Sequence, residues 1–314
     1  MKSLTVKESK ARKKRKTVLK KIFLYTLLAF FGITMVIPFL WTISTSLKAP
    51  GNIFTYPPSW IPNPVRWINY LEAWRAVPFG RGYINSLFIA IVVTVGQVLT
   101  SALAAYGFAR LSFPGRDKLF FGYLGTMMIP GAVTTIPVFI LFKKLPEVLN
   151  WIFHTGFWST PQYLGPYLLG NPIGIDSFFA LIAPGLFSAY GTFLLRQFFM
   201  GIPGDLEDAA RIDGSSHFGT FFRIILPLSK PALATLAIFT FMGSWRNFLW
   251  PLIITNSMQM KTIPVMIASF QGLYTTDWNL LMAASLIALV PMLIVFIVGQ
   301  RFFVEGIRLG AIKG

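Results

Sequence analysis

Long apolar segments separated by short clusters of charged residues dominate the sequence. A bilayer core about 30 Å thick is crossed by roughly 20 apolar residues in a helix. Five segments of about this length contain no Asp, Glu, Lys or Arg, and a sixth contains only Arg246. The pattern predicts an all-α integral membrane protein with six transmembrane helices, at residues 22–47, 82–109, 119–142, 177–195, 231–256 and 278–300.

Lys and Arg are distributed unequally between the two sides that six spans define. An even number of spans places both termini on the same side. This side holds twenty of the 28 basic residues, ten of them in residues 1–21, whereas the opposite side holds seven. Because loops rich in Lys and Arg remain in the cytoplasm, we predict that both termini are cytoplasmic.

The composition supports a membrane protein. Hydrophobic residues make up 54% of the chain and charged residues only 12%, against about 25% charged in soluble domains. The net charge of +17 suggests nucleic acid at first sight. However, the basic run at residues 10–16 directly precedes a span, where it is better suited to anionic lipid headgroups. We therefore expect membrane lipids, and no nucleic acid, as partners. The chain has no Cys and thus no disulfide or thiolate site.

The apolar and charged segments suggest four parts. The first span is too long for the 7–15-residue core of a cleavable signal peptide, so it is predicted to be an uncleaved anchor. Gly, Pro and aromatic residues at 143–176 indicate an interfacial or re-entrant insertion, and 63–74 is expected to form a short surface helix. The parts are a basic cytoplasmic tail (1–21), the first helix with an external loop (22–79), a five-helix core (80–302) that contains the external insertion 143–176 and a cytoplasmic loop 200–230, and a C-terminal tail (303–314).

The loop at 200–230 has a regular pattern. Asp205 is predicted to cap a short helix, with Asp208 completing a capping box. This helix is expected to stop at Gly214, a residue type that favours the position after a helix end. Ser215 or Ser216 would cap a second helix, predicted to end before Pro227. The loop would therefore present two short helices joined by a tight turn.

The same loop resembles the EAA loop of ABC-importer permeases. The resemblance lies in Asp208-Ala209-Ala210, Gly214 three residues later, and Ile224-x-Leu226-Pro227 further on, with Asp in the place of the usual Glu. Other segments resemble the maltose-type, carbohydrate-uptake branch of that family: FLLRQFF (193–199), IPGDLEDAARIDG (202–214), ILPLSKPAL (225–233), GSWRNFLWPLI (243–253) and FVEGIRLGAIKG (303–314).

This resemblance implies the type I ABC-importer permease fold in a bacterial cytoplasmic membrane. It implies a second, related permease subunit as a heterodimer partner, two cytoplasmic ATPase subunits that bind ATP and Mg, and an extracytoplasmic solute-binding protein. The helix Leu206–Ile212 would couple to an ATPase, with Glu207 or Asp208 as its polar contact. The implied coupling residues are Glu207, Asp208, Ala209, Ala210, Arg211, Asp213, Gly214, Leu226 and Pro227.

The segment Trp245-Arg246-Asn247 departs from the sugar-permease pattern, which has Trp-Asn followed by an acidic residue. A charge near the middle of a span costs about 2.5–3.5 kcal/mol unless it is paired or hydrated. One hypothesis is that these residues line the substrate path and that Arg246 binds the carboxylate of an acidic oligosaccharide. The alternatives are that Arg246 snorkels to the outer interface, or bonds helix-end carbonyls at a permease dimer interface.

No catalytic, metal or cofactor site is predicted in this chain. The sequence lacks a phosphate-binding GxxxxGK[ST] motif, HExxH and GxSxG, and its two histidines are far apart. We therefore predict a transport subunit that is not an enzyme, with ATP hydrolysed by partner chains. The alternative, a self-sufficient secondary transporter, would need acidic residues inside the spans for ion coupling, and none is present. A membrane-embedded enzyme would need convergent catalytic groups.

Overall fold

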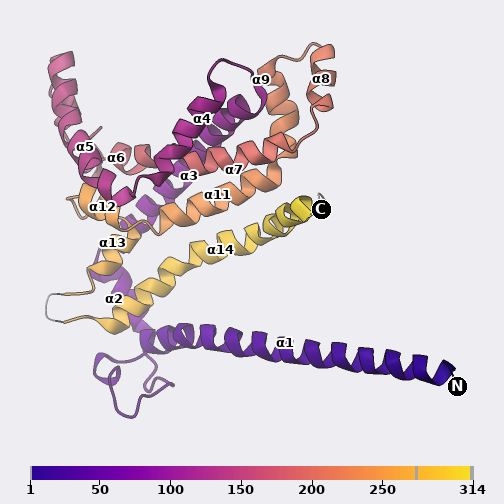
Figure 1. Cartoon of the computed structure of the whole chain (residues 1–314). Helices are drawn as coiled ribbons and strands as arrows, with labels where there is room; N and C mark the ends of the chain where they lie inside the picture. Colours follow the sequence, from indigo (N-terminus) through magenta and orange to yellow (C-terminus); the bar gives the residue numbers. More distant parts are fainter. Residues whose placement is uncertain (1, 273–274, 312–314) are drawn as a thin grey trace. The chain divides into compact units, whose positions relative to one another are not determined.

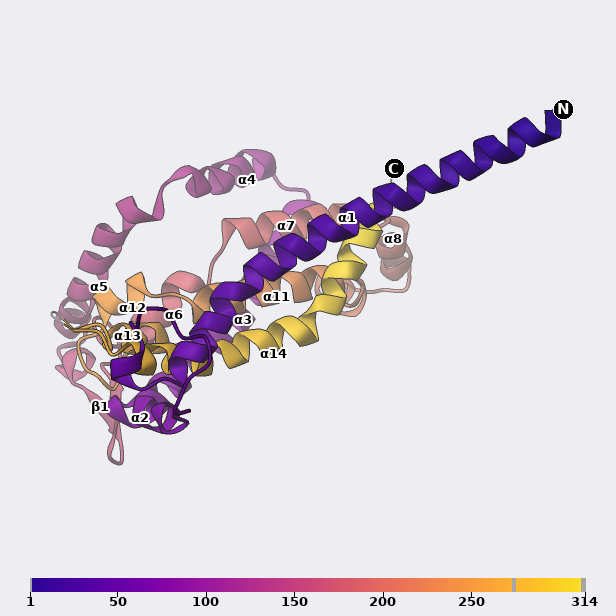
Figure 2. The same cartoon turned by 90° about the horizontal axis from the view of Figure 1, so that it is seen from below.

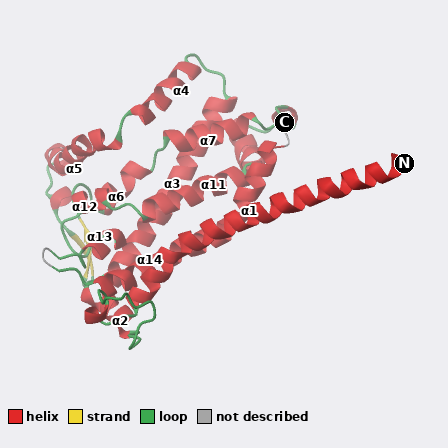
Figure 3. Cartoon of the chain, turned by 60° about the horizontal axis from the view of Figure 1, so that its bottom comes forward, coloured by secondary structure: helices red, strands yellow, loops and turns green. Residues whose placement is uncertain are grey.

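A computed structural model of the chain describes residues 2–272 and 275–311. These residues are mostly helical, with one short β-hairpin among them (Figure 3). They form two compact units, Met1–Ala73 with Gly272–Leu286, and Trp74–Gln271 with Ile287–Gly314. The boundaries fall within α2 (Ile68–Ala76) and α14 (Trp278–Ala311), which therefore contribute to both units.

The first unit is dominated by α1 (Lys2–Ser46), one unbroken helix (Figure 2). Its part Lys16–Ser46 is long and apolar enough to cross a membrane, which confirms the predicted helix at 22–47. At 1.5 Å per residue these 31 residues extend about 46 Å, more than the bilayer core requires. The short helix expected at 63–74 begins later, at Ile68, and the loop before it contains a 3₁₀ turn, η1 (Pro50–Asn52).

Buried polar side chains fix the chain where α1 ends. The side-chain nitrogen of Asn69 donates hydrogen bonds to the carbonyls of Ser46, at 2.8 Å, and Lys48, at 2.9 Å. Asn279 in turn donates to the Asn69 side-chain oxygen at 3.3 Å. The Lys48 ammonium lies 4.0 Å from the ring centroid of Trp41. Burial lowers the pKa of Lys48, because the charged form loses hydration.

The core of the second unit is built around α3 (Phe79–Arg110), a single helix, as predicted for residues 82–109, that is long and apolar enough to cross a membrane. The helices α7 (Ala189–Met200) and α11 (Lys230–Trp245) pack along it (Figure 1). Close approach depends on small residues, as is typical of helix contacts in membranes. A Cβ atom at Gly191 would lie only 2.6 Å from Ser101 Oγ and 3.2 Å from Leu236 Cδ2.

Two predicted spans are bent helix pairs. Residues 119–142 were expected to form one helix, but the chain breaks at Pro130, and the helices on either side meet at 97°. Proline cannot donate a backbone hydrogen bond, so the helix ends before it. The span expected at 177–195 bends by 40° after a 3₁₀ turn that contains Pro184. The elements are α4 (Arg116–Gly125), η2 (Thr126–Met128), α5 (Gly131–Phe153), α6 (Phe178–Ile182), η4 (Ala183–Gly185) and α7.

The predicted span 231–256 is also not continuous. The helix α11 ends at Trp245, and α12 (Leu249–Ile254) follows after a break. Pro251 explains the break, because it has no N–H to donate to the carbonyl of Asn247 four residues earlier. Instead α11 pairs with the helical segment before it, His217–Leu228, across a bend of 78°. The described residues thus contain three helices able to cross a membrane, or up to six if each bent pair is one span.

The segment 143–176 is more ordered than an interfacial loop. The helix α5 continues to Phe153, and a 3₁₀ turn, η3 (Phe157–Ser159), follows it. The strands β1 (Gln162–Leu164) and β2 (Tyr167–Gly170) then form an antiparallel hairpin (Figure 2). Arg81 at the start of α3 donates to the carbonyl of Leu168 at 2.6 Å. Gln259, which precedes α13 (Ile263–Ala268), accepts from the Leu168 amide at 3.1 Å.

The close packing at Gly191 gives a test of this arrangement. We expect Gly191→Leu to lower the free energy of unfolding by about 1–3 kcal/mol, because the added atoms would overlap Ser101 and Leu236. Gly107→Leu is the matched control, since a Cβ atom at Gly107 meets nothing within 4 Å. Thermal unfolding of both variants in detergent, followed by tryptophan fluorescence, measures the difference. Equal shifts for the two variants would contradict the packing.

Candidate functional site

The first helix of the 200–230 loop is α8 (Asp205–Ile212), close to the predicted bounds. Its cap is not the predicted one. Gly204 occupies the N-cap position, and Asp205 is already helical. The Gly204 carbonyl accepts hydrogen bonds from the amides of Glu207, at 2.8 Å, and Asp208, at 3.1 Å. The acidic residues of the first turn stabilise α8 through the helix dipole and not through a capping box.

The end of α8 confirms the predicted turn at Gly214. This residue has a φ of 81°, in the left-handed region that favours glycine. The Ser215 amide donates to the Ala210 carbonyl at 2.8 Å, and the Gly214 amide donates to the Arg211 carbonyl at 3.0 Å. These two bonds form a Schellman motif, which satisfies the carbonyls left free at the helix end.

The second helix of the loop is longer than predicted. Ser216 caps it, and its hydroxyl accepts from the Gly219 amide at 3.2 Å. The helical path does not end before Pro227 but continues to Leu228. Pro227 lies just after the π-helical turn, at the start of the last segment. The segments are α9 (His217–Thr220), the π-helical turn η5 (Phe221–Ile225) and α10 (Leu226–Leu228).

The residues implied for ATPase coupling divide into an inner and an outer set. Glu207 and Ala210 are buried, three residues apart on one face of α8. Asp208, Ala209 and Arg211 are exposed on the rest of the helix. Of the remaining implied residues, Asp213, Gly214 and Pro227 are exposed and Leu226 is half-buried. The outer set lies beside Ile212, which is 87% exposed, so this surface is apolar as well as charged.

Glu207 faces an arginine of its own chain. Its Oε1 lies 2.8 Å from Arg110 Nε, and both side chains are largely buried. The Arg110 Nη2 atom also donates to the carbonyls of Phe199, at 2.7 Å, and Ile202, at 2.6 Å. Sequence reasoning missed Arg110, which it counted only as a topological charge. The sequence feature that could have identified Arg110 is its position at the end of a long apolar helix.

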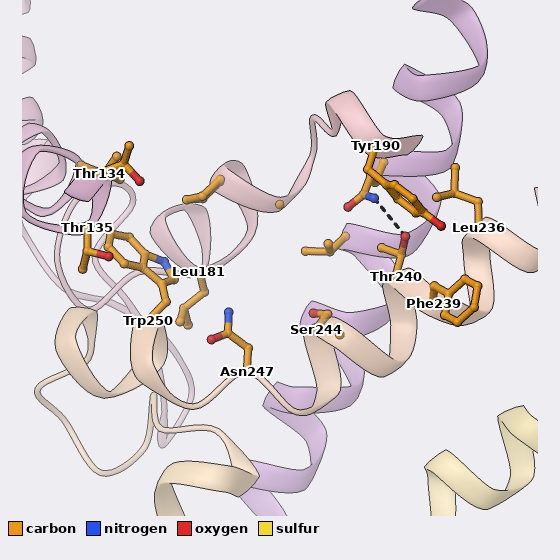
Figure 4. Close-up of a pocket in the computed structure, with 16 residues that line it drawn as sticks. Thr134, Thr135, Leu181, Tyr190, Leu236, Phe239, Thr240, Ser244, Asn247 and Trp250 are labelled. Atoms are coloured by element: carbon orange, nitrogen blue, oxygen red, sulfur yellow. Dashed lines mark hydrogen bonds between the residues drawn. The ribbon is translucent and has the colours of Figure 1, made fainter. Parts of the chain in front are cut away.

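A cavity of about 480 Å³ lies among α3, α5, α7, α11 and α12 (Figure 4). Its polar lining consists of hydroxyl and amide groups, and Phe239 and Trp250 provide aromatic surface. None of the lining residues that the structure describes is charged. The polar lining residues are Gln97, Thr134, Thr135, Tyr190, Thr240, Ser244 and Asn247.

Hydrogen bonds hold several of these side chains in place. Gln97 Nε2 donates to Thr240 Oγ1 at 3.0 Å (Figure 4). The Trp250 indole donates to the Ala180 carbonyl at 2.8 Å, which fixes the plane of its ring. Uncharged hydroxyl and amide groups can both donate and accept. Such a lining suits a polar ligand with many hydroxyl groups. Within the described residues no group of His, Asp and Glu could hold a metal ion.

The three residues expected on the substrate path lie in different surroundings. Asn247 lines the cavity. Trp245 is buried, and its indole donates to the Ala288 carbonyl at 3.0 Å. Arg246 is exposed at the C-cap of α11, not in the middle of a helix, and its Nε donates to the Met242 carbonyl at 3.2 Å. It therefore bonds a carbonyl in the last turn of its own helix.

The fold and the cavity define a helical membrane protein with broken helices around a polar space. Residues 97–309, more than half of the chain, match the family described as binding-protein-dependent transport system inner membrane component. The chain belongs to this family, which confirms the predicted resemblance.

Relatives and solved structures are consistent with that membership. The chain is 35% identical over 230 residues to the arabinooligosaccharides transport system permease protein AraQ of Halalkalibacterium halodurans, covering 73% of each chain. It is 35% identical over 265 residues to the sn-glycerol-3-phosphate transport system permease protein UgpE of Pectobacterium atrosepticum, covering 81% of this chain and 84% of the relative. The fold is similar to a bacterial ABC transporter involved in the import of the acidic polysaccharide alginate. That likeness has a TM-score of 0.73 at 20% identity and covers 91% and 96% of the two chains.

Membership in this family fixes the general role of the chain. It is a permease subunit of an ABC importer and not itself an enzyme. The alternatives of a self-sufficient secondary transporter and a membrane-embedded enzyme are thereby excluded.

The turn at Gly214 generates a prediction for the loop. Any Cβ in the left-handed conformation costs roughly 1–2 kcal/mol, so Gly214→Ala should raise amide exchange across α8 by about tenfold. Hydrogen–deuterium exchange with mass spectrometry measures this. Gly204→Ala is the control, because Gly204 has right-handed helical angles and open space at its Cβ. Unchanged exchange in Gly214→Ala would contradict the left-handed conformation of this residue.

Proposed function

We propose that this chain is the permease subunit of an ATP-driven importer of sugars or oligosaccharides, and that the cavity lies on the substrate path. The observation that carries the proposal is the cavity lining. Its hydroxyl and amide groups match the hydroxyl groups of a sugar, and the Trp250 ring offers a flat surface for the apolar face of a sugar ring. The names of two relatives, which concern arabinooligosaccharides and sn-glycerol-3-phosphate, support a carbohydrate or polyol substrate.

In this proposal each bent helix pair crosses the membrane once, giving six spans with both termini in the cytoplasm. The excess of Lys and Arg in the N-terminal segment and in the loops on the same side as residues 200–230 supports this orientation. The membrane is the bacterial cytoplasmic membrane, and its anionic lipids surround the basic residues at 1–21. The proposal retains the division of the chain into a basic tail, a first helix with an external loop, a five-helix core and a C-terminal tail. The helix α5 extends into the insertion at 143–176.

The outer surface of α8 is the proposed contact with an ATPase subunit. Asp208, Ala209, Arg211 and Asp213 are exposed there, and the exposed Ile212 side chain adds apolar area. Glu207, Ala210, Gly214, Leu226 and Pro227 shape the loop. Two such ATPase subunits would bind ATP and Mg, and a second, related permease would complete the pathway. A solute-binding protein would deliver the sugar, as the alginate transporter was solved with a pentasaccharide-bound periplasmic protein.

A finer proposal concerns the charge of the substrate. Arg246 is exposed and directly precedes Asn247, which lines the cavity; Arg246 itself is not a lining residue, and its Nε bonds the Met242 carbonyl. A guanidinium suits the carboxylate of an acidic oligosaccharide. The fold likeness to a transporter of the acidic polysaccharide alginate supports the same idea. Trp245 supports this segment from within the core and does not line the cavity.

Filling the cavity tests the transport path. A Cβ atom at Gly243, which lines the cavity, meets nothing within 4 Å, so Gly243→Leu would place its side chain in the open space. We expect ATP-driven oligosaccharide uptake into proteoliposomes to fall by about tenfold, because a side chain that obstructs the path is expected to cost about 1–3 kcal/mol. Gly122→Leu is the control, since Gly122 also has open space but does not line the cavity. Normal uptake by Gly243→Leu would place the path elsewhere.

Substituting Arg246 tests the acidic substrate. Arg246→Ala should reduce uptake of acidic oligosaccharides by about tenfold, because a charge-assisted hydrogen bond contributes about 1.5–3 kcal/mol. Uptake of neutral oligosaccharides of the same length should be unchanged. Competition uptake assays with both classes provide the measurement. Equal losses for the two classes would refute a carboxylate contact.

A further inference from the structure

We propose that Arg110 is a positioning residue that transmits movement of α8 to the helices around the cavity. The inference deepens the proposed function and rests on it, because it assumes that α8 meets an ATPase. It concerns a residue on the inner side of the loop, away from the surface proposed for docking.

Arg110 joins three segments through one guanidinium group. It is the last residue of α3. Its Nε lies 2.8 Å from the Glu207 carboxylate on α8. Its Nη2 donates to the carbonyls of Phe199, in the last turn of α7, and Ile202, just beyond that helix. The planar guanidinium holds the two carbonyls through Nη2 while its Nε side forms the ion pair with Glu207, an arrangement that a lysine ammonium cannot reproduce.

A second bond on the same face of α3 holds the other half of the loop. The Tyr106 hydroxyl donates to the His217 carbonyl, at the start of α9, at 3.2 Å. Tyr106 and Arg110 are four residues apart, so they project from the same side of the helix. The two helices of the loop are therefore each fastened to the last turns of α3.

Two of the segments that Arg110 joins, α3 and α7, reach the cavity directly. Gln97 on α3 and Tyr190 on α7 both line it. The apolar core between the loop and the cavity is continuous and includes Phe199 and Phe221. Because such interiors are close-packed, a displacement of α8 that Arg110 passes to α3 and α7 would change the cavity walls.

The pair is suited to this role because it is buried. The side chains of Arg110 and Glu207 are 15% and 6% exposed. Removing one partner would leave an uncompensated buried charge, so the contact resists separation when α8 is pushed or pulled. By contrast, the exposed pair Arg66–Glu72, at 3.4 Å, has side chains 37% and 44% exposed and is expected to contribute little.

The test uses the assembled importer in proteoliposomes, with sugar uptake and ATP hydrolysis measured together. Glu207→Gln removes the ion pair but keeps the carbonyl bonds of Arg110. Arg110→Lys keeps a positive charge but loses the planar guanidinium that bonds the two carbonyls. We expect both variants to retain the ATPase subunits and ATP hydrolysis, while sugar transported per ATP falls about fivefold or more. Arg66→Gln is the control and should behave as the wild type.

Other outcomes overturn the inference. Unchanged transport per ATP in both variants would show that the Arg110 contacts transmit no movement of α8. A loss of ATPase subunits, with uptake and hydrolysis falling in parallel, would show that the pair only supports assembly. If the wild type itself shows no ATP-driven sugar uptake, the proposed function fails first.

A distance measurement within this chain tests whether Arg110 fixes α8 even in that case. The chain has no cysteine, so cysteines introduced at the exposed positions Ser112 and Asp205 can carry two spin labels. We expect a narrow distance distribution between α8 and the end of α3 in the wild type and a broad one in Glu207→Gln. Equal widths would show that Arg110 does not fix α8, whatever the substrate or partner.

Discussion

Inside a membrane, every backbone carbonyl and amide freed by a helix break must find a partner within the protein. The second unit meets this requirement with side chains. The Trp250 indole bonds the Ala180 carbonyl in α6, and Thr100 bonds the carbonyl of Leu186 between η4 and α7. Because these partners are polar, the breaks gather hydroxyl and indole groups in one region.

The cavity follows from this constraint. Thr134 and Thr135 lie just after the break at Pro130, Pro184 and Gly185 form the break before α7, and Asn247 lies between α11 and α12. Residues that end or interrupt three different helices therefore meet around one space (Figure 4). Continuous helices would place apolar side chains there and leave no reason for a polar lining. The broken helices and the proposed sugar path have the same physical origin.

The sequence allowed the apolar segments, the family and the turn at Gly214 to be predicted, because each depends on neighbouring residues. The breaks were harder to predict, because the segment 231–256 is as apolar as a continuous span. The proline signal at Pro130 and Pro251 was visible, but kinked helices have the same signal. The pair Arg110–Glu207 could not be predicted, since its partners lie in helices far apart in the sequence. The family resemblance instead implied that Glu207 contacts a partner protein.

The placement of charge along α3 explains why one helix can serve both ends of the second unit. Arg81 near its start bonds the hairpin at 162–170, and Arg110 at its end bonds α7 and pairs with α8. Between them the helix has no charged residue, and Gln97 reaches the cavity. A charge in that middle stretch would be costly in a membrane, whereas a charge at either end can reach a polar region. The helix ends can therefore hold strong, directional contacts while its middle stays neutral enough to face an uncharged cavity.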